Sequence, residues 1–189
     1  MTGDSLRERS KARRREAILT AAYELFAERG FDATSIADIA EAAEVSPRTV
    51  TLYFPTKLEL ATAHFNAFVD RLTAALHARP MGQGIIDTLE QWLREQTAPQ
   101  DEFDVLHDRM LQSNPQLKGL CRGRLTDAIQ EGTRLLAEEQ GRGPDDFAPR
   151  ILASTVASVI AELRHRSGPG DLETAMTFIR AAAATLQRG

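Results

Sequence analysis

Two closely spaced helix-start signals constrain the fold of this chain more than any other feature. Thr34 or Ser35 can cap a first helix, and Ser35 and Asp38 have the spacing of a capping box, in which a hydroxyl and a carboxylate satisfy free backbone amides. Ser46 followed by Pro47 is a second start signal, because serine caps free amides and proline fits the first helical position. Only about three residues separate the two predicted helices, and so short a connection is typical of a helix-turn-helix.

Longer helices are predicted on both sides of this unit. Upstream, residues 13–31 show an amphipathic pattern with Phe26 on the buried side, and Gly30 supplies the stop. Downstream, Thr56 and Glu59 form a further capping box that opens a long helix. The second short helix is then the recognition helix, which this arrangement presents to a DNA major groove.

The run of residues 13–60 resembles the DNA-binding head of the TetR family of bacterial transcriptional regulators. The matching elements are AAYELFAERGFDATSIADIA, the VSPRT of residues 45–49, and YFPTK before an apolar-periodic helix. The resemblance implies a ligand-responsive regulator of the bacterial cytoplasm, usually a repressor, with a DNA-binding domain in residues 1–57 and a motif over about 35–54. Glu44 departs from the family pattern, since glycine is common at this point of the turn and a non-glycine residue at positive φ is strained.

The composition excludes several classes of protein. Ala, Leu, Glu and Arg dominate and strand-like alternation is absent, so we expect an all-α fold in which a larger helical domain follows the head. The chain has no apolar run of about 18 residues, the length needed to span a membrane, and its polar, basic N-terminus does not resemble a secretory leader. The single cysteine, Cys121, forbids an internal disulfide and fits a reducing cytoplasm.

The distribution of charge fits a protein that touches nucleic acid at one end. The net charge is −4, yet residues 1–57 hold nine basic and nine acidic side chains, so residues 58–189 carry the whole excess. Between Arg7 and Arg15 there are six basic residues against one acidic residue, Glu8. This run is either a solvated tail or a phosphate-binding arm, and the neighbouring helix-turn-helix favours the arm.

Exposed residues near the start of the recognition helix are the candidates for reading DNA. Arg48 is the one side chain there that can donate two hydrogen bonds to a guanine edge. The resemblance implies that Pro47, Arg48 and Thr51 face bases and that most of the other candidates face the sugar–phosphate backbone. The alternative for the hydroxyl residues is a purely structural role as helix caps. The complete set of predicted DNA-binding residues is Thr34, Ser35, Ser46, Pro47, Arg48, Thr49, Thr51, Tyr53 and Lys57.

Residues 58–189 are predicted to form a helical effector-binding and dimerisation domain. The predicted helices cover residues 58–79, 84–96, 101–112, 115–140, 145–166 and 169–187. The last two are apolar on more than one narrow stripe, so packing within one chain does not account for their whole surface. The family resemblance implies that they pair with their copies in a homodimer, over about residues 145–187; the alternative is burial within the chain.

A small-molecule site is expected among the middle helices, a common location in helical folds. His107 and Arg124 stand out because a buried polar group needs a partner, whereas ordinary core packing is the alternative for every candidate. The stretch HDRMLQSNPQLKGLCRGRLTDAIQEG also resembles the effector domain of some actinobacterial regulators proposed to bind acyl-coenzyme A-like molecules. We therefore expect a small apolar or amphipathic effector. The candidate effector-binding residues are Phe65, Phe68, Trp92, Phe103, His107, Met110, Leu111, Cys121 and Arg124.

Signatures of catalysis and of metal or cofactor binding are missing from the sequence. The four histidines show no HExxH spacing, the glycine-containing stretches lack the lysine and hydroxyl of a phosphate loop, and no GxSxG elbow occurs. We predict no catalytic, metal-binding or cofactor-binding residue. A helical enzyme with a vestigial head is disfavoured by the arginine run and by Arg48, and a protein-interaction module that needs no ligand is a second alternative.

Overall fold

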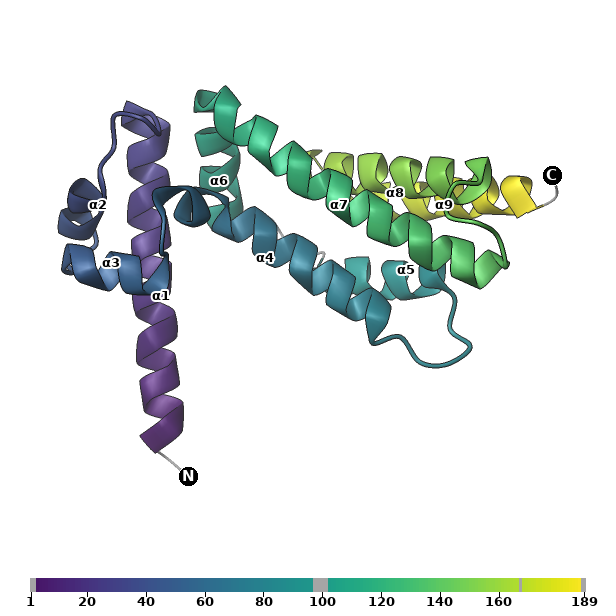
Figure 1. The fold of residues 1–189 in the computed structure, drawn as a ribbon, viewed down its shortest axis with the longest axis horizontal. Helices are drawn as coiled ribbons and strands as arrows, with labels where there is room; N and C mark the ends of the chain where they lie inside the picture. Colours follow the sequence, from purple (N-terminus) through teal and green to yellow (C-terminus); the bar gives the residue numbers. More distant parts are fainter. Residues whose placement is uncertain (1–2, 97–101, 167, 188–189) are drawn as a thin grey trace. The chain divides into compact units, whose positions relative to one another are not determined.

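A computed structural model describes residues 3–96, 102–166 and 168–187. Within these ranges the chain is built from nine α-helices and no strands, which confirms the predicted all-α fold (Figure 1). The helices are α1 (Gly3–Arg29), α2 (Ile36–Ala42), α3 (Pro47–Tyr53), α4 (Lys57–His77), α5 (Ile85–Gln96), α6 (Glu102–Ser113), α7 (Pro115–Gln140), α8 (Phe147–Arg166) and α9 (Asp171–Gln187).

The predicted start of the first helix is wrong, whereas the predicted bounds of the others are close. The sequence pattern placed this start at Arg13, but α1 already includes Gly3 and therefore runs through the segment expected to be an arm. Every residue of 6–9 and 11–16 is Leu, Arg, Lys, Glu or Ala, and these residue types favour a helix even where nothing packs against it. All side chains from Leu6 to Ala17 are exposed, so this part of α1 has a helical backbone without a buried face.

The chain divides into two compact units. The first contains Met1–Phe65 together with Gln100–Cys121, and the second contains Asn66–Pro99 together with Arg122–Gly189. In the first unit, α6 packs along α1, so this later helix belongs to the same body as the helix-turn-helix. The apolar residues of α6 do not reveal from the sequence which helix they pack against. The boundary after residue 57 that we expected from the sequence stays a prediction.

The apolar core of the first unit packs α2 and α3 against α1. Tyr23 and Phe26 of α1, Ile39 of α2 and Val50 of α3 are fully buried in one apolar cluster. Burial of each such side chain contributes about 1.5–3 kcal/mol. Since α2 and α3 have seven residues each and isolated helices of that length are not stable, their positions depend on this core.

The second unit has two apolar clusters of its own. One gathers Leu135, Leu136 and Leu152, and the other gathers Trp92 and Ile179. Here α9 packs against both α8 and α5. Among the described residues, no helix combines the length and the apolar character that a membrane span requires.

Candidate nucleic-acid interface

The first short helix begins at the capping box that the sequence predicts. Ser35 Oγ accepts a hydrogen bond from the Asp38 amide at 3.2 Å, and Asp38 Oδ2 accepts one from the Ser35 amide at 2.7 Å. The hydrogen bonds from the Ser35 hydroxyl and amide lower the pKa of the Asp38 carboxyl. The start of α2 is therefore fixed by two residues that both lie at the surface of the head.

The turn between α2 and α3 is a Schellman motif with a glutamate in the left-handed position. The Val45 amide donates to the Ala40 carbonyl at 2.9 Å and the Glu44 amide donates to the Glu41 carbonyl at 3.1 Å. Glu44 has φ of 53°, the only positive φ of a non-glycine residue among the described residues. The sequence predicted strain at this position, and the backbone here adopts the conformation that usually selects glycine.

Ser46 caps α3 and sets which of its faces is exposed. Its hydroxyl accepts a hydrogen bond from the Thr49 amide at 3.1 Å, and Pro47 occupies the first turn. Val50 points into the core, while Pro47, Arg48 and Thr51 are exposed. The predicted base-reading residues therefore share the solvent side of one short, capped helix.

Two predicted backbone-contact residues have structural partners instead of open surface. Thr34 is 1% exposed and its hydroxyl donates to the Gly30 carbonyl at 2.9 Å, so its side chain cannot reach a phosphate. The Lys57 ammonium donates to the Phe31 carbonyl at 2.7 Å and the Thr34 carbonyl at 2.9 Å, and it lies 4.3 Å from the centroid of the Phe31 ring. These contacts close the loop between α1 and α2 and use two of the three N–H donors of the ammonium group.

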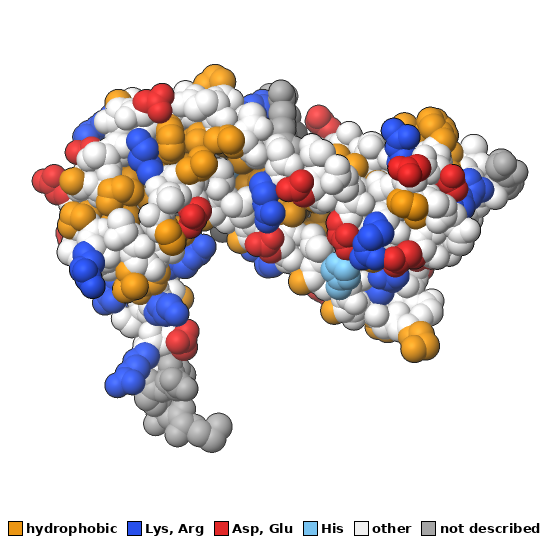
Figure 2. Space-filling model, viewed as in Figure 1, with side chains coloured by type: hydrophobic (Ala, Val, Ile, Leu, Met, Phe, Trp, Pro, Cys, Tyr) orange, Lys and Arg blue, Asp and Glu red, His pale blue; other side chains and the backbone are white. Residues whose placement is uncertain are grey.

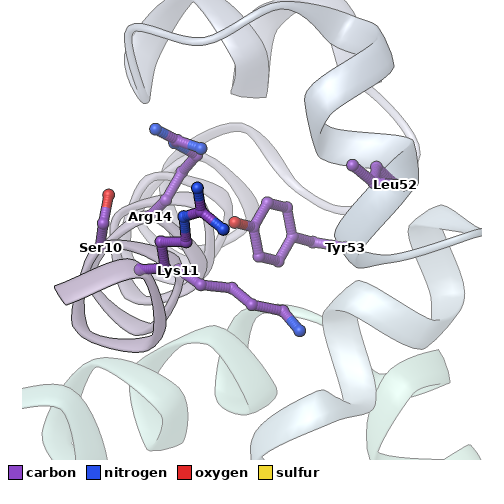
Figure 3. A pocket seen from close by; sticks show the side chains of 6 residues that line it. Ser10, Lys11, Arg14, Leu52 and Tyr53 are labelled. Atoms are coloured by element: carbon purple, nitrogen blue, oxygen red, sulfur yellow. The ribbon is translucent and has the colours of Figure 1, made fainter. Parts of the chain in front are cut away.

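Basic side chains extend the exposed surface of the head along α1. Figure 2 shows Lys and Arg side chains on the part of the first unit that α1 forms. Arg15 has its guanidinium 5.0 Å from the centroid of the Phe54 ring, at the end of α3, and so ties α1 to the recognition helix. Tyr53 is half-buried against the core, and its hydroxyl points toward the basic side chains of α1 (Figure 3).

Comparison with known proteins assigns the family. Residues 18–63 match the model described as bacterial regulatory proteins, tetR family. The HTH-type transcriptional regulator TcmR of Streptomyces glaucescens is 28% identical over 98% of this chain and 88% of that protein. The chain belongs to the TetR family. The HTH-type transcriptional regulator Mb3439c of Mycobacterium bovis is 47% identical over 33% of each chain.

Solved structures share the fold of the whole chain. Salmonella enterica GusR has a TM-score of 0.64 at 24% identity and covers 93% of this chain and 96% of its own. NalD, the secondary repressor of the MexAB-OprM multidrug efflux pump in Pseudomonas aeruginosa, has a TM-score of 0.62 at 22% identity, with 92% and 97% covered. The relatives are transcriptional regulators, so this TetR-family protein is a DNA-binding regulator of transcription and not an enzyme.

One exposed residue of the TetR-type head was not predicted as a contact. Leu52 is 80% exposed on α3, one helical turn after Arg48. A leucine in an amphipathic helix is normally assigned to the core, which is why its residue type gave no signal. Its spacing did give one, because a residue four positions after Arg48 lies beside Arg48 on a helix.

The candidate effector residues of this TetR-family chain fall in both units. Phe65, Phe103, His107, Met110, Leu111 and Cys121 belong to the first, and Phe68, Trp92 and Arg124 belong to the second. Met110 and Trp92 are part of the apolar clusters of their units. Arg124, expected to be a buried polar group, is instead exposed and pairs with Asp70 at 2.9 Å.

His107 fits the expectation of a buried polar group. It is 2% exposed, and among the described residues neither of its ring nitrogens has a hydrogen-bond partner, although Asp108 Oδ1 lies 3.8 Å from Nδ1. Its ring centroid lies 4.9 Å from that of His64 and 5.6 Å from that of Tyr23. The Tyr23 hydroxyl accepts a hydrogen bond from the His64 amide at 3.2 Å, and burial raises the pKa of Tyr23. Among the described residues, no three His, Cys, Asp or Glu side chains are grouped so that they could hold a metal ion.

Proposed function

We propose that this protein is a dimeric repressor in the bacterial cytoplasm that binds a palindromic operator and is released from it by a small effector. The observation that carries the proposal is the exposed face of α3, where Pro47, Arg48 and Thr51 project from a helix fixed by the Ser46 cap and by the core. A rigid helix of this kind, held at the surface of a three-helix head, enters the DNA major groove.

Arg48 is assigned to base reading and the hydroxyl residues mainly to positioning. An exposed guanidinium near the start of α3 can donate two hydrogen bonds to the O6 and N7 atoms of guanine. Ser35, Ser46 and Thr49 lie at or next to the N-termini of α2 and α3, where a hydroxyl and the helix dipole favour a phosphate oxygen. Tyr53 and the remaining donor of Lys57 complete the backbone contacts, and Thr34 takes no part.

Exposed apolar side chains on the last two helices support dimerisation. Phe147 and Ile151 of α8 and Phe178 of α9 are 72%, 39% and 55% exposed. Large exposed apolar side chains on one pair of packed helices favour an interface with a partner. A second copy is the partner that also provides two heads for a palindromic site.

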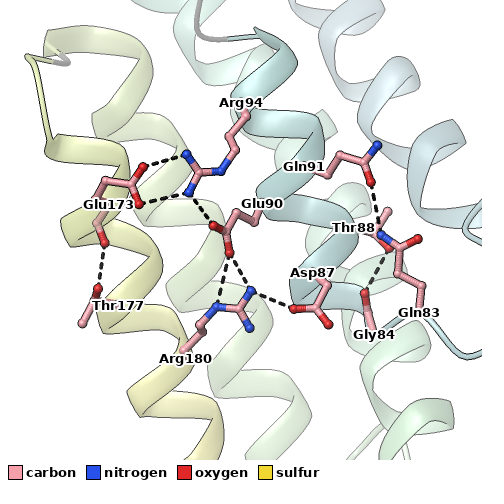
Figure 4. Close-up of polar contacts among 10 residues, drawn as sticks. All are labelled: Gln83, Gly84, Asp87, Thr88, Glu90, Gln91, Arg94, Glu173, Thr177 and Arg180. Carbon is pink, nitrogen blue, oxygen red and sulfur yellow. Dashed lines mark hydrogen bonds and ion pairs between the residues drawn. The ribbon is translucent and has the colours of Figure 1, made fainter.

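Ionic contacts at the surface join α9 to α5. Arg180 of α9 bonds Asp87 at 2.7 Å and Glu90 at 2.6 Å, and Arg94 bonds Glu90 and Glu173, both at 2.6 Å (Figure 4). The hydrogen bonds from Arg180 and Arg94 lower the pKa of Glu90. Exposed pairs of this kind each contribute only about 0.2–1 kcal/mol, but the network fixes the rotation of α9 relative to α5.

His107 is the residue that best supports an effector site. A buried imidazole whose nitrogens lack partners is less stable by about 1–3 kcal/mol than a satisfied one, and a ligand with a polar group can supply the missing bond. Phe103 and Tyr23 beside it offer apolar and aromatic surface, which fits an amphipathic effector such as an acyl-coenzyme A-like molecule. Such a ligand acts through its different affinities for the DNA-bound and released states.

Selection of bound fragments from random DNA tests the proposal. We expect an enriched site with two-fold symmetry and half-sites about 34–36 Å apart from centre to centre, or a multiple of this spacing. An enriched site without symmetry would contradict the dimer, and no enrichment at moderate salt would contradict sequence-specific binding. A melting-temperature screen against metabolites and lipid-like compounds separates an effector-controlled regulator from an interaction module, since only the former is stabilised by a ligand.

A further inference from the structure

A groove on the head lies between the N-terminal half of α1 and the end of α3. It has a volume of about 510 Å³ and is lined by Arg7, Ser10, Lys11, Arg14, Leu52 and Tyr53. Figure 3 shows the basic side chains of α1 on one side and Tyr53 on the other, with the phenol hydroxyl directed between them. The groove therefore exists because α1 remains helical through the segment that the sequence suggested was an arm.

The basic lining comes from one face of α1. Arg7, Lys11 and Arg14 follow the i, i+4, i+7 spacing that places side chains on the same side of a helix. All three are exposed, and none of the ion pairs found among the described side chains involves them. Arg9 and Arg13 lie on the other side of α1, where they line a smaller depression with Leu6 and with Ser10, the one residue that it shares with the groove. The basic run is thus divided into two faces, and only one of them borders the recognition helix.

The spacing of the three cations fits a linear polyanion better than a single anion. At a rise of 1.5 Å per residue, Arg7 and Arg14 lie about 10 Å apart along the helix axis. One phosphate group cannot bridge that distance, whereas a DNA strand carries a negative charge about every 3.4 Å along its axis. The opposite wall offers a phenol hydroxyl that can donate to a phosphate and an exposed leucine that can contact a sugar.

We propose that this groove binds the sugar–phosphate backbone of the duplex whose bases α3 reads. Arg7, Lys11 and Arg14 contact successive phosphates of one strand, the Tyr53 hydroxyl donates to a phosphate oxygen, and Leu52 packs on deoxyribose. The inference rests on the proposed function, because it assumes that α3 enters a major groove of DNA. It assigns the contacts with the DNA backbone to three of the six basic residues between Arg7 and Arg15. Arg9 and Arg13 make none of these contacts.

Two charge-matched double variants of the full chain test this assignment. Lys11→Gln/Arg14→Gln removes two charges from the groove, and Arg9→Gln/Arg13→Gln removes two from the other face of the same helix. The affinity of each variant for the selected operator is measured between low and moderate salt. We expect the groove variant to reduce the slope of log K against log [salt] by about 1.8, that is, about 0.9 for each lost phosphate contact. The control variant should change the slope by less than half as much, and an equal change in both variants would overturn the proposal.

Neutral phosphates locate the contact on the DNA. A set of operators is made, each with one methylphosphonate at a different position, so that each lacks the charge of one phosphate. The unchanged protein should bind an operator more weakly when the methylphosphonate replaces a phosphate that the groove holds. The affinity of the groove variant should not change when the methylphosphonate lies at those same positions. The control variant should show the same dependence of affinity on methylphosphonate position as the unchanged protein. Identical profiles for the unchanged protein and the groove variant would contradict the site.

Folding and the proposed function are checked separately. The substituted side chains are all exposed, so the thermal melting of both variants should match that of the unchanged protein. If the unchanged protein binds no duplex selectively, the proposed function fails together with this groove. If it binds its operator and both variants behave alike, only the groove assignment fails.

Discussion

Asn114 accepts a hydrogen bond from the amide of Phe31 at 2.6 Å, across a sequence separation of 83 residues. The same carboxamide donates to the Phe26 carbonyl at 2.8 Å and to the Met110 carbonyl at 2.8 Å. Asn114 is 1% exposed and lies where α6 ends and α7 begins, whereas Phe31 follows the end of α1 and leads into α2. One buried side chain thus joins the α6–α7 junction to the entrance of the helix-turn-helix.

Loss of this carboxamide should destabilise the head. In Asn114→Ala the Phe31 amide loses its acceptor and the Met110 and Phe26 carbonyls each lose a donor, although the Phe26 carbonyl keeps the Gly30 amide at 3.1 Å. We therefore expect the free energy of unfolding to fall by about 2–4 kcal/mol. Denaturant titration measures this free energy of unfolding. Gln116→Ala, at an exposed position of α7 two residues later, is the control and should change stability by less than about 0.5 kcal/mol. A similar loss in both variants would show that the carboxamide contributes nothing specific.

Replacement of Arg48 should remove sequence preference without affecting the fold. Arg48→Ala deletes an exposed side chain whose guanidinium makes no ion pair found among the described residues, so stability should change little. Discrimination between the selected operator and one with the contacted guanine replaced should fall by about 1–3 kcal/mol, as measured by competition binding. Arg29→Ala, an exposed arginine at the end of α1, serves as the control. Unchanged discrimination in Arg48→Ala would exclude it as a base reader.

Features that depend on residues close together in the sequence were predicted, whereas contacts with residues distant in the sequence were missed. The caps at Ser35 and Ser46 and the strained turn at Glu44 were all visible, because each depends on residues three or four positions apart. The structural partners of Thr34 and Lys57 were not foreseen, since hydroxyl and ammonium groups look available until the backbone carbonyls that accept from them are placed nearby.

The same limit applies to the packing of α6. The contacts of Asn114 with α1 leave no periodic pattern in the sequence. The helical N-terminal half of α1 was missed for a different reason. Its residue types favour a helix, but the absence of an apolar stripe made the segment look like a solvated arm.

The capping box should make part of the stability depend on pH in the acidic range. The hydrogen bonds from Ser35 lower the pKa of Asp38 in the folded protein. A carboxyl group whose folded pKa is depressed contributes stability that is fully present above its unfolded value, near about 3.9, and is lost as the pH falls through the folded value. Asp38→Asn should therefore be less stable than the unchanged protein at neutral pH, and the two should converge in acid.

Ser35→Ala separates the capping box from other effects of the Asp38 carboxylate. With the serine hydroxyl removed, the pKa of Asp38 loses part of the cause of its depression, so the stability difference produced by Asp38→Asn should depend less on pH. Free energies of unfolding of the four proteins, measured at neutral pH and in acid, form the double-mutant cycle. The same pH dependence in both backgrounds would assign the effect to groups other than Ser35.

Glycine at the turn should stabilise the head. Glu44 adopts φ of 53°, where a Cβ atom is strained, and the Schellman hydrogen bonds depend only on the backbone. We expect Glu44→Gly to raise the free energy of unfolding by about 0.5–1 kcal/mol, the strain relief being partly offset by the greater freedom of glycine in the unfolded chain. Glu44→Ala retains the Cβ atom and should show no gain. Equal stability of the glycine and alanine variants would mean that the turn tolerates a side chain without strain.

Replacement of His107 should raise the stability of the protein and remove its response to an effector. Neither ring nitrogen has a hydrogen-bond partner among the described residues, the Asp108 carboxylate lying 3.8 Å from Nδ1, so His107→Phe replaces an unsatisfied polar ring by an apolar ring of similar shape. We expect the ligand-free protein to gain about 1–3 kcal/mol of stability, measured by denaturant titration. Compounds that raise the melting temperature of the unchanged protein should no longer do so in the variant, because the nitrogens that would bind their polar group are gone.

His77→Phe is the control, since His77 lies at the surface of α4 and pairs with Glu131 at 2.8 Å. A His107→Phe protein that is less stable than the unchanged one, or that still responds to the same compounds, would place the effector site elsewhere.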